Sequence, residues 1–181
     1  MFLELLVDRD IDLIFGNVGS DFPPVIEALA RSGEKINPFI VPHENVALAM
    51  AYGYYMPTGR MQAVALHVGQ GTANGLNGII NAGRQSIPML ILAGRTPIIE
   101  SEVLGGRNNY INWGQEMFDQ AGMVREFVKW ECELRDSRQL ESIIDRAIAM
   151  TEPRGPVYLT LPAKSWPTPC WVKPPSAPAP L

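Results

Sequence analysis

Cysteine and histidine are scarce in this sequence, and their scarcity excludes several kinds of site. The chain has two cysteines, Cys132 and Cys170, whose separation fits neither a zinc-ligand spacing nor a disulfide framework. We expect both to be reduced thiols, as in a cytoplasmic protein. The two histidines, His43 and His67, lack the neighbouring ligands that a metal centre needs, so we predict no metal site in this chain.

Charge of one sign and long apolar runs are also missing. The 15 basic and 19 acidic side chains give a net charge of −4, without the basic face of a nucleic-acid binder. No apolar stretch approaches the roughly 18 to 20 residues of a membrane span. Residues 1–9 lack the basic start and the cleavage site of a signal peptide, and they predict an amphipathic helix. We therefore expect neither a nucleic-acid partner nor a membrane partner.

What the sequence does contain is an alternation of apolar runs and helical segments. Its 181 residues are 46% hydrophobic and 19% charged, enough for one domain with its own core. Runs rich in Val, Ile and Leu predict buried parallel strands at 13–15, 39–41, 63–68, 89–93, 128–132 and 157–161. Helices are predicted at 23–31, 45–56, 72–85, 112–120 and 138–151. The last of these has an inward-facing apolar stripe, formed by Leu140, Ile143, Ile144, Ala147 and Ile148.

This order of elements predicts an α/β fold with a doubly wound, mostly parallel open sheet flanked by helices. In such sheets ligands bind at the carboxyl ends of the strands. We assign residues 1–165 to this domain. Residues 166–181 are rich in proline and predict an extended linker. Such a linker indicates a chain cut from a longer one, although a frayed terminus would have the same composition.

Glu44 is the first candidate site residue. It stands in Pro42-His43-Glu44-Asn45, where a predicted strand gives way to a helix of small and apolar residues. A lone carboxyl in such surroundings is costly to ionise, so it can trade a proton with a heterocycle. A carboxylate at a helix N-terminus is also ordinary, because the helix dipole favours it. The small side chains of the helix predict close packing, within the fold or between subunits.

The second candidate is the glycine-rich stretch Gly69-Gln70-Gly71-Thr72-Ala73-Asn74-Gly75, which follows a predicted strand. Its glycines do not have the spacing of a dinucleotide-binding fingerprint, because the third comes one residue late. A glycine-rich bend can still present backbone groups to a flat ligand. A tight turn before a closely packed helix explains the same glycines equally well.

Two further side chains could act on a substrate. His67 ends the strand before the glycine-rich stretch, and Ser20 lies in the first strand-to-helix loop, residues 15–21. A structural histidine is the plainer interpretation of the first. The plainer interpretation of Ser20 is a cap on the next helix, which Asp21 could equally provide. A Ser-His-Asp hydrolase is not supported, because no glycine-flanked serine elbow is present.

Taken in order, these segments resemble the N-terminal pyrimidine-binding (Pyr) domain of thiamine-diphosphate enzymes of the acetolactate synthase, pyruvate oxidase and benzoylformate decarboxylase group. The similarity runs from about Asp12 to Pro162. Its marks are the segments 15–20, His43-Glu44, 58–60, 69–75, 86–94 and 154–162. The resemblance implies a flavodoxin-like fold.

The same resemblance implies a role for Glu44. It matches the glutamate that hydrogen-bonds a ring nitrogen of the aminopyrimidine, favouring the imino tautomer that removes the thiazolium proton. Thiamine diphosphate would then be bound along Gly69, Gln70, Gly71, Thr72 and Asn74, with Asn17, Val18 and Gly19 nearby.

Ser20 and His67 match positions that face the substrate in benzoylformate decarboxylase. The resemblance implies that His67 carries a proton and that Ser20 orients the carboxylate of a 2-oxo acid. The sequence departs from the family pattern at Val18, where proline is usual, and at Gln70. These departures leave the reaction open between decarboxylation, acyl-carbanion transfer and oxidation.

The other half of such a site is absent from this sequence, which has no Gly-Asp-Gly stretch of the kind that holds magnesium in the family's diphosphate-binding domain. The resemblance implies that this chain is inactive alone, and that it works with that domain in a homodimer or a larger homo-oligomer. Three forms stay open: the N-terminal domain of a longer enzyme, the Pyr subunit of a split two-chain decarboxylase, and a non-catalytic interaction module of the same fold.

Overall fold

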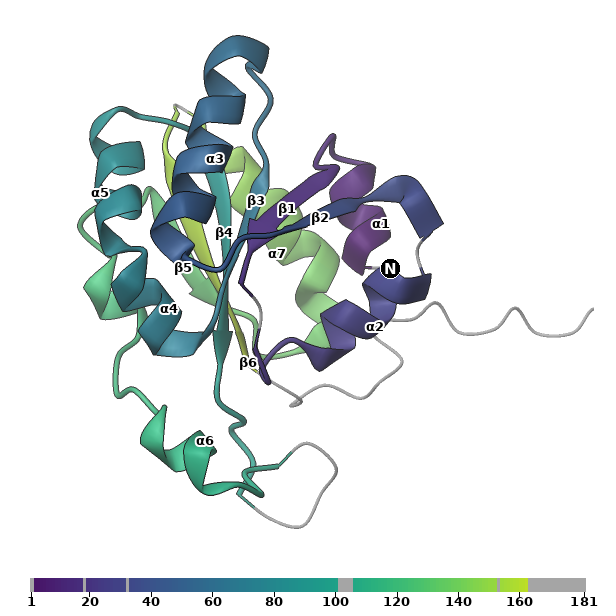
Figure 1. The fold of residues 1–181 in the computed structure, drawn as a ribbon, viewed down its shortest axis with the longest axis vertical. Helices are drawn as coiled ribbons and strands as arrows, with labels where there is room; N and C mark the ends of the chain where they lie inside the picture. Colours follow the sequence, from purple (N-terminus) through teal and green to yellow (C-terminus); the bar gives the residue numbers. More distant parts are fainter. Residues whose placement is uncertain (1, 18, 32, 101–105, 153, 163–181) are drawn as a thin grey trace, which may run out of the picture.

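The computed structural model describes residues 2–17, 19–31, 33–100, 106–152 and 154–162. A six-stranded sheet runs through it in the order β2-β1-β3-β4-β6-β5, and every neighbouring pair is parallel (Figure 1). The strands are β1 Leu13–Gly16, β2 Asn37–Ile40, β3 Ala63–Leu66, β4 Met89–Arg95, β5 Trp130–Glu133 and β6 Pro156–Pro162. This architecture confirms the doubly wound α/β fold predicted from the sequence.

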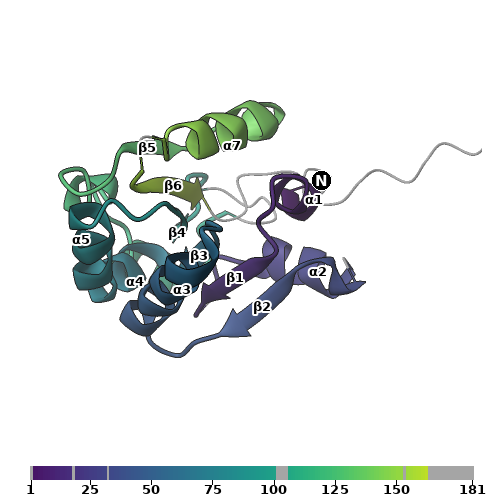
Figure 2. The same ribbon diagram turned by 90° about the horizontal axis from the view of Figure 1, so that it is seen from above.

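Helices cover both faces of the sheet, as the view from above shows (Figure 2). One face carries α1 Phe2–Val7, α2 Pro23–Arg31 and α7 Leu140–Ala149, and the other carries α3 Glu44–Thr58 and α5 Leu76–Arg84. Successive strand residues point to opposite faces, so Leu90 and Leu92 join the first apolar cluster while Met89 and Ile91 join the second. The domain therefore has two apolar cores separated by one sheet.

The most regular helix prediction is confirmed. In α7 the predicted stripe is buried at Leu140, Ile143, Ile144 and Ala147, against the sheet and α1. The central strands β3, β4 and β6 are almost wholly buried, as predicted for strands covered on both faces. The two edge strands differ: every residue of β2 is exposed, and β5 is half-buried. An edge strand has one neighbour only, so part of its surface is left open.

Two helix predictions were wrong in their bounds. The predicted helix 72–85 is two helices, α4 Val68–Asn74 and α5, which meet at Gly75. Helix α4 begins directly after His67, so the glycine-rich stretch is helix and not a bend, and β3 stops at Leu66. The predicted helix 112–120 is reduced to α6 Tyr110–Gly114. Glycine has a low helix propensity, and in α4 tertiary contacts override it.

The direction of winding reverses between β1 and β3, because the chain passes from β1 to the edge strand β2 before it returns to β3. Crevices at such a reversal, outside the carboxyl ends of the strands, are the usual ligand sites of open α/β sheets. The loop after β1 and the start of α4 meet at this place. The predicted linker, 166–181, lies outside the described residues. Among the residues described, no helix is long and apolar enough to cross a membrane.

Candidate functional site

Glu44 is buried at the first turn of α3, with 7% of its surface exposed. Its Oε2 atom accepts a hydrogen bond from Asn74 Nδ2, 2.5 Å away at the end of α4. Among the described residues this is the only hydrogen bond found for the carboxyl, and it leaves Oε1 uncommitted. The structure thus buries this carboxyl, and its amide partner comes from the glycine-rich stretch.

The surface beside that carboxyl is made of glycine. A Cβ added at Gly71 would lie 3.1 Å from Glu44 Oε1, and one at Gly75 would lie 2.7 Å from a methyl group of Leu48. Helices α3 and α4 approach closely because Gly71 of α4 and Gly75 at its end carry no side chains. The carboxyl therefore packs directly against the backbone of α4.

His67 is the second centre of the site and occupies the N-cap position of α4, where its side chain makes no capping hydrogen bond. Its Nδ1 atom is 2.6 Å from Asp21 Oδ1, and its Nε2 atom is 3.1 Å from Gln115 Nε2. The hydrogen bond to Asp21 raises the pKa of His67 above its ordinary value, burial opposes this, and the charges of Asp21 and Glu44 raise the pKa further. The imidazole is therefore held between a buried carboxylate and a neutral amide.

Asp21 is buried, with 8% of its surface exposed, and both of its oxygens have partners. Oδ1 faces His67, and Oδ2 accepts the backbone N–H of Val68 at 3.1 Å. Val68 has a positive φ of 39°, which is uncommon for a β-branched residue and marks local strain at the start of α4. Asp21 thus caps a helix that begins 47 residues after it, and not the helix that follows it in sequence.

Two glycines make room for this pair. A Cβ at Gly94, in β4, would lie 1.5 Å from Asp21 Oδ2, and a Cβ at Gly19 would lie 2.4 Å from His67 Nδ1. Neither position tolerates a side chain while Asp21 and His67 stay where they are. The carboxylate and the imidazole are therefore enclosed from both sides.

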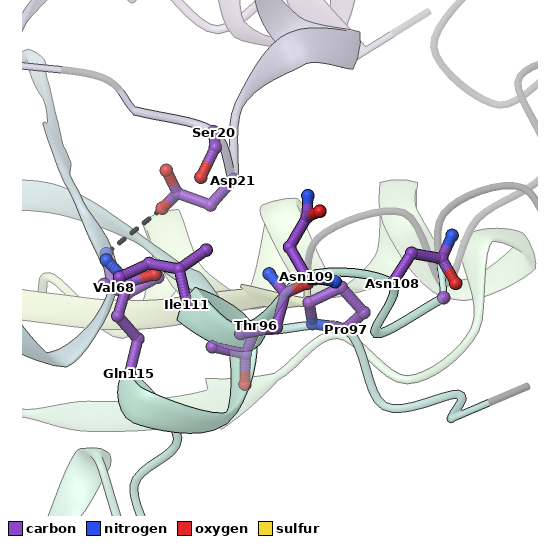
Figure 3. Close-up of a pocket in the computed structure, with 11 residues that line it drawn as sticks. Ser20, Asp21, Val68, Thr96, Pro97, Asn108, Asn109, Ile111 and Gln115 are labelled. Carbon is purple, nitrogen blue, oxygen red and sulfur yellow. Dashed lines mark hydrogen bonds between the residues drawn. The ribbon is translucent and has the colours of Figure 1, made fainter.

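A cavity of about 130 Å³ opens beside this pair (Figure 3). Ser20 and Asp21 line one side, and Gln115 and Ile111 lie across from them in the figure. The rest of the lining is polar but uncharged for the most part, with the side chains of Thr96, Asn108, Asn109 and Asn112. The predicted residue Ser20 is exposed and borders this cavity.

An ion-pair network holds the segment that carries Gln115. The neighbouring Glu116 accepts hydrogen bonds from Arg95 at 3.1 Å and from Arg107, and also from the hydroxyl of Thr96. Burial alone would raise the pKa of Glu116, but the hydrogen bonds from Thr96 and Arg95 and the charge of Arg107 outweigh it and lower the pKa. These contacts tie the segment after α6 to the end of β4.

The structure divides the predicted cofactor-binding residues into groups. Asn74 and Gly71 lie at Glu44, and Asn17 reaches the same junction by donating from Nδ2 to the carbonyl of Pro42 at 3.4 Å. The others lie elsewhere: Gly69 packs on Met117, Gln70 is exposed, Thr72 is fully buried, and Gly19 lies at His67. Val18 lies outside the described residues.

The hydroxyl of Thr72 belongs to the core. It is 2.8 Å from the hydroxyl of Tyr158, which also accepts from Gln120 Nε2 at 2.9 Å. Burial raises the pKa of Tyr158 to about 12, so this phenol stays protonated. Thr72 therefore joins α4 to the sheet.

Sequence reasoning missed Asp21 and Gln115 as partners of His67. Asp21 carries a weak signal, since it is a carboxylate in the loop after β1, at the carboxyl edge of the sheet. Gln115 has no local signal. In the part of the chain that the structure describes, no three His, Cys, Asp or Glu side chains are grouped to hold a metal ion.

Comparison with known proteins places this chain in a family. The family model described as "Thiamine pyrophosphate enzyme, N-terminal TPP binding domain" matches residues 1–123. The sulfoacetaldehyde acetyltransferase of Rhodobacter capsulatus is 29% identical over 89% of this chain and 26% of its own length. The benzoylformate decarboxylase of Pseudomonas aeruginosa is 29% identical over 92% of this chain and 30% of its own. The acetolactate synthase large subunit of Haemophilus influenzae is 30% identical over 90% of this chain and 27% of its own length.

A solved structure agrees with these relatives. The thiamine diphosphate-dependent 4-hydroxybenzoylformate decarboxylase of Rhodococcus jostii superposes with a TM-score of 0.74 at 27% identity, over 94% of this chain and 30% of that one. This chain thus spans less than a third of the length of these proteins. The chain belongs to the thiamine pyrophosphate enzyme family, and what it contains is the family's N-terminal TPP binding domain.

Proposed function

We propose that this chain binds the aminopyrimidine ring of thiamine diphosphate for an enzyme that acts on 2-oxo acids, and that Glu44 is the residue that shares a proton with the ring. The observation that carries the proposal is the state of the Glu44 carboxyl. It is buried, one oxygen is fixed by Asn74, and the other lies against the glycine backbone of α4.

These residues fit the aminopyrimidine group. A ring nitrogen must reach a carboxyl oxygen, and Glu44 Oε1 has no hydrogen-bond partner among the described residues and no side chain at position 71 to cover it. A ring nitrogen needs a carboxyl that can hold or accept a proton in a site sheltered from water, and Glu44 meets this need. When bound, the cofactor supplies the carbanion chemistry, and the protein supplies orientation and proton transfer.

The second centre would serve the substrate. His67 would carry a proton to or from the reacting group, and Ser20 would orient the carboxylate of a 2-oxo acid at the mouth of the adjoining cavity. In support, the imidazole lies within hydrogen-bonding distance of Asp21 and Gln115, and both of these line the cavity with Ser20. The cavity lining is mainly neutral, so it does not select which reaction follows decarboxylation of the substrate.

A diphosphate-binding domain would complete the site, in the same chain or in a partner subunit. That domain would hold magnesium and the diphosphate group, and two Pyr domains would meet in a homodimer or a larger homo-oligomer. The proposal covers both a longer enzyme and a split two-chain decarboxylase.

The test is Glu44→Gln in the complete protein with its diphosphate-binding domain. We expect exchange of the thiazolium C2 proton for deuterium to slow by about 10²- to 10⁴-fold, because the amide cannot share a proton with the ring. NMR of the bound cofactor measures this rate. The matched control is Glu27→Gln, which removes an exposed carboxylate paired with Arg31 on α2 and should leave the rate unchanged.

Two results would count against the proposal. Exchange at the unaltered rate in the Glu44→Gln protein would remove Glu44 from this role. Failure of the unaltered complete protein to bind thiamine diphosphate would instead favour a non-catalytic interaction module of the same fold.

A further inference from the structure

Asp21 makes contacts that the proposed chemistry does not require. It is a buried carboxylate whose two oxygens are both occupied inside the protein, one by an imidazole nitrogen and the other by a backbone N–H. It comes from the loop after β1, whereas both of its partners come from the junction of β3 and α4. Both oxygens already accept hydrogen bonds inside the protein, and of the two partners only His67 titrates, so the chemical effect of Asp21 falls first on that imidazole.

The contact with Asp21 decides which nitrogen of His67 carries a proton. An ionised carboxylate only accepts hydrogen bonds, so Nδ1, 2.6 Å from Asp21 Oδ1, must be the donor. In the neutral imidazole the other nitrogen, Nε2, then has a free lone pair. Nε2 faces the side-chain amide of Gln115 at 3.1 Å.

Gln115 suits both protonation states of Nε2. Its NH₂ group can donate to the lone pair of the neutral ring, and its carbonyl oxygen can accept from the imidazolium after the amide turns over. Glu116, the next residue, is held by Arg95 and Arg107, so the backbone that carries this amide is fixed. The proton on Nε2 can therefore come and go without rebuilding the site.

We propose that Asp21 is a positioning residue for His67, which it holds in the Nδ1–H tautomer with Nε2 directed toward Gln115 and the adjoining cavity, so that Nε2 is the atom that gains and loses the proton. This inference deepens the proposed function, because His67 acts on substrate only if that function is correct. The tautomer of His67 and the role of Asp21 in setting it do not depend on the proposed function.

The charges around the imidazole favour its protonated form. Asp21, from the β1–α2 loop, is in direct contact, and Glu44, from α3, acts at longer range. The segment after α6 contributes the neutral Gln115. The raised pKa of His67 agrees with this arrangement, in which the charges that act on the ring from the described residues are those of two carboxylates.

The first test uses the unaltered chain and NMR of its histidine side chains. The protein has two histidines, so a His67→Asn variant assigns the signals of His67 and leaves those of His43. We expect the ¹⁵N shifts of His67 above its titration midpoint to show a protonated Nδ1 and an unprotonated Nε2. An Nε2–H tautomer in the unaltered protein would overturn the inference.

The second test is Asp21→Asn, which keeps the shape of the side chain and removes its charge. We expect the titration midpoint of His67 to fall toward the ordinary value and the tautomer to become mixed, because an amide offers only one acceptor oxygen. Ser20→Ala, at the neighbouring cavity position, is the matched control and should leave both readouts unchanged. An unaltered midpoint and tautomer in folded Asp21→Asn protein would show that Asp21 only caps α4.

The same variant in the complete enzyme separates this inference from the proposed function. We expect kcat to fall by about 10²-fold or more, with the acidic limb of its pH profile displaced in the same direction as the NMR midpoint. If His67→Ala leaves kcat unchanged, the proposed role of His67 in turnover fails while the NMR result still decides the inference. If kcat falls in Asp21→Asn without any shift in the pH profile, the positioning role is refuted.

Discussion

Gly94→Ala should break the contacts between Asp21 and the start of α4 without touching either partner. The added Cβ would lie 1.5 Å from Oδ2, 2.4 Å from Cγ and 2.9 Å from Cβ of Asp21, so the two side chains cannot share the space. Gly94 is in a central strand, paired with Leu161 of β6, and its backbone has no room to move away. The side chain of Asp21 is therefore expected to leave its site.

The size of the destabilisation follows from two hydrogen bonds. Asp21 would give up its bonds to Val68 N–H and to His67, each of which involves a charged partner. Hydrogen bonds to charged groups contribute about 1.5 to 3 kcal/mol each, so we expect the free energy of unfolding to fall by about 3 kcal/mol or more. For a chain of this size that decrease corresponds to about 6 to 12 °C in Tm. Urea unfolding and thermal melts measure the two quantities.

A double-mutant cycle shows whether the destabilisation passes through Asp21. An Asp21→Ala background lacks Oδ2 and Cγ and keeps the Cβ contact at 2.9 Å, so Gly94→Ala should cost clearly less there than in the unaltered protein. Gly53→Ala is the matched control, because a Cβ at this exposed position of α3 meets no atom within 4 Å. We expect the control to be neutral or stabilising by up to about 1 kcal/mol. Equal costs of Gly94→Ala in the two backgrounds would refute the reasoning.

Two further predictions follow from the same geometry. Gly83→Ala should lower the free energy of unfolding by about 1 to 3 kcal/mol, because the new Cβ would lie 2.2 Å from the backbone oxygen of Phe127. The control is Gly114→Ala, whose new Cβ meets nothing within 4 Å, and equal urea midpoints for the two variants would contradict the prediction. The pH prediction concerns His67, whose pKa is raised in the folded chain by the hydrogen bond to Asp21 against the effect of burial. Its contribution to stability is complete below the ordinary pKa of about 6.5 and fades as pH rises through the folded value. The difference in unfolding free energy between the unaltered protein and its His67→Asn variant should shrink between about pH 5.5 and pH 8.5, and a constant difference would disprove it.

The fold was predictable because its signals are local. The stripe of α7 and the apolar runs of β3, β4 and β6 need only a window of a few residues to be recognised, and the alternation of strands and helices then fixes the class. The start of α4 was not predictable in the same way. Its sequence, with glycine at positions 69 and 71, is a poor helix former, and the cap that supports it comes from a distant loop.

The part of the site that lies at the ends of strands was predictable, and the rest was not. Glu44 and His67 each follow a strand, so sequence order alone places them at the same edge of the sheet. Asp21 and Gln115 are 46 and 48 residues from His67, and no periodic pattern relates positions so far apart. Their contacts with the imidazole depend on how the loop after β1 and the segment after α6 fold back onto the start of α4.

The two buried carboxyls of this edge differ in what their surroundings leave available. Both oxygens of Asp21 are bound inside the protein, to an imidazole that is itself titratable and to a backbone N–H that never releases its proton. Glu44 has one oxygen fixed by an amide and the other beside a glycine. Of these two carboxyls only Glu44 has an oxygen without a hydrogen-bond partner among the described residues, which is why the proposed proton exchange with the aminopyrimidine is assigned to it and not to Asp21. Under the proposed function, the contribution of Asp21 is to set how its neighbour His67 is oriented and protonated.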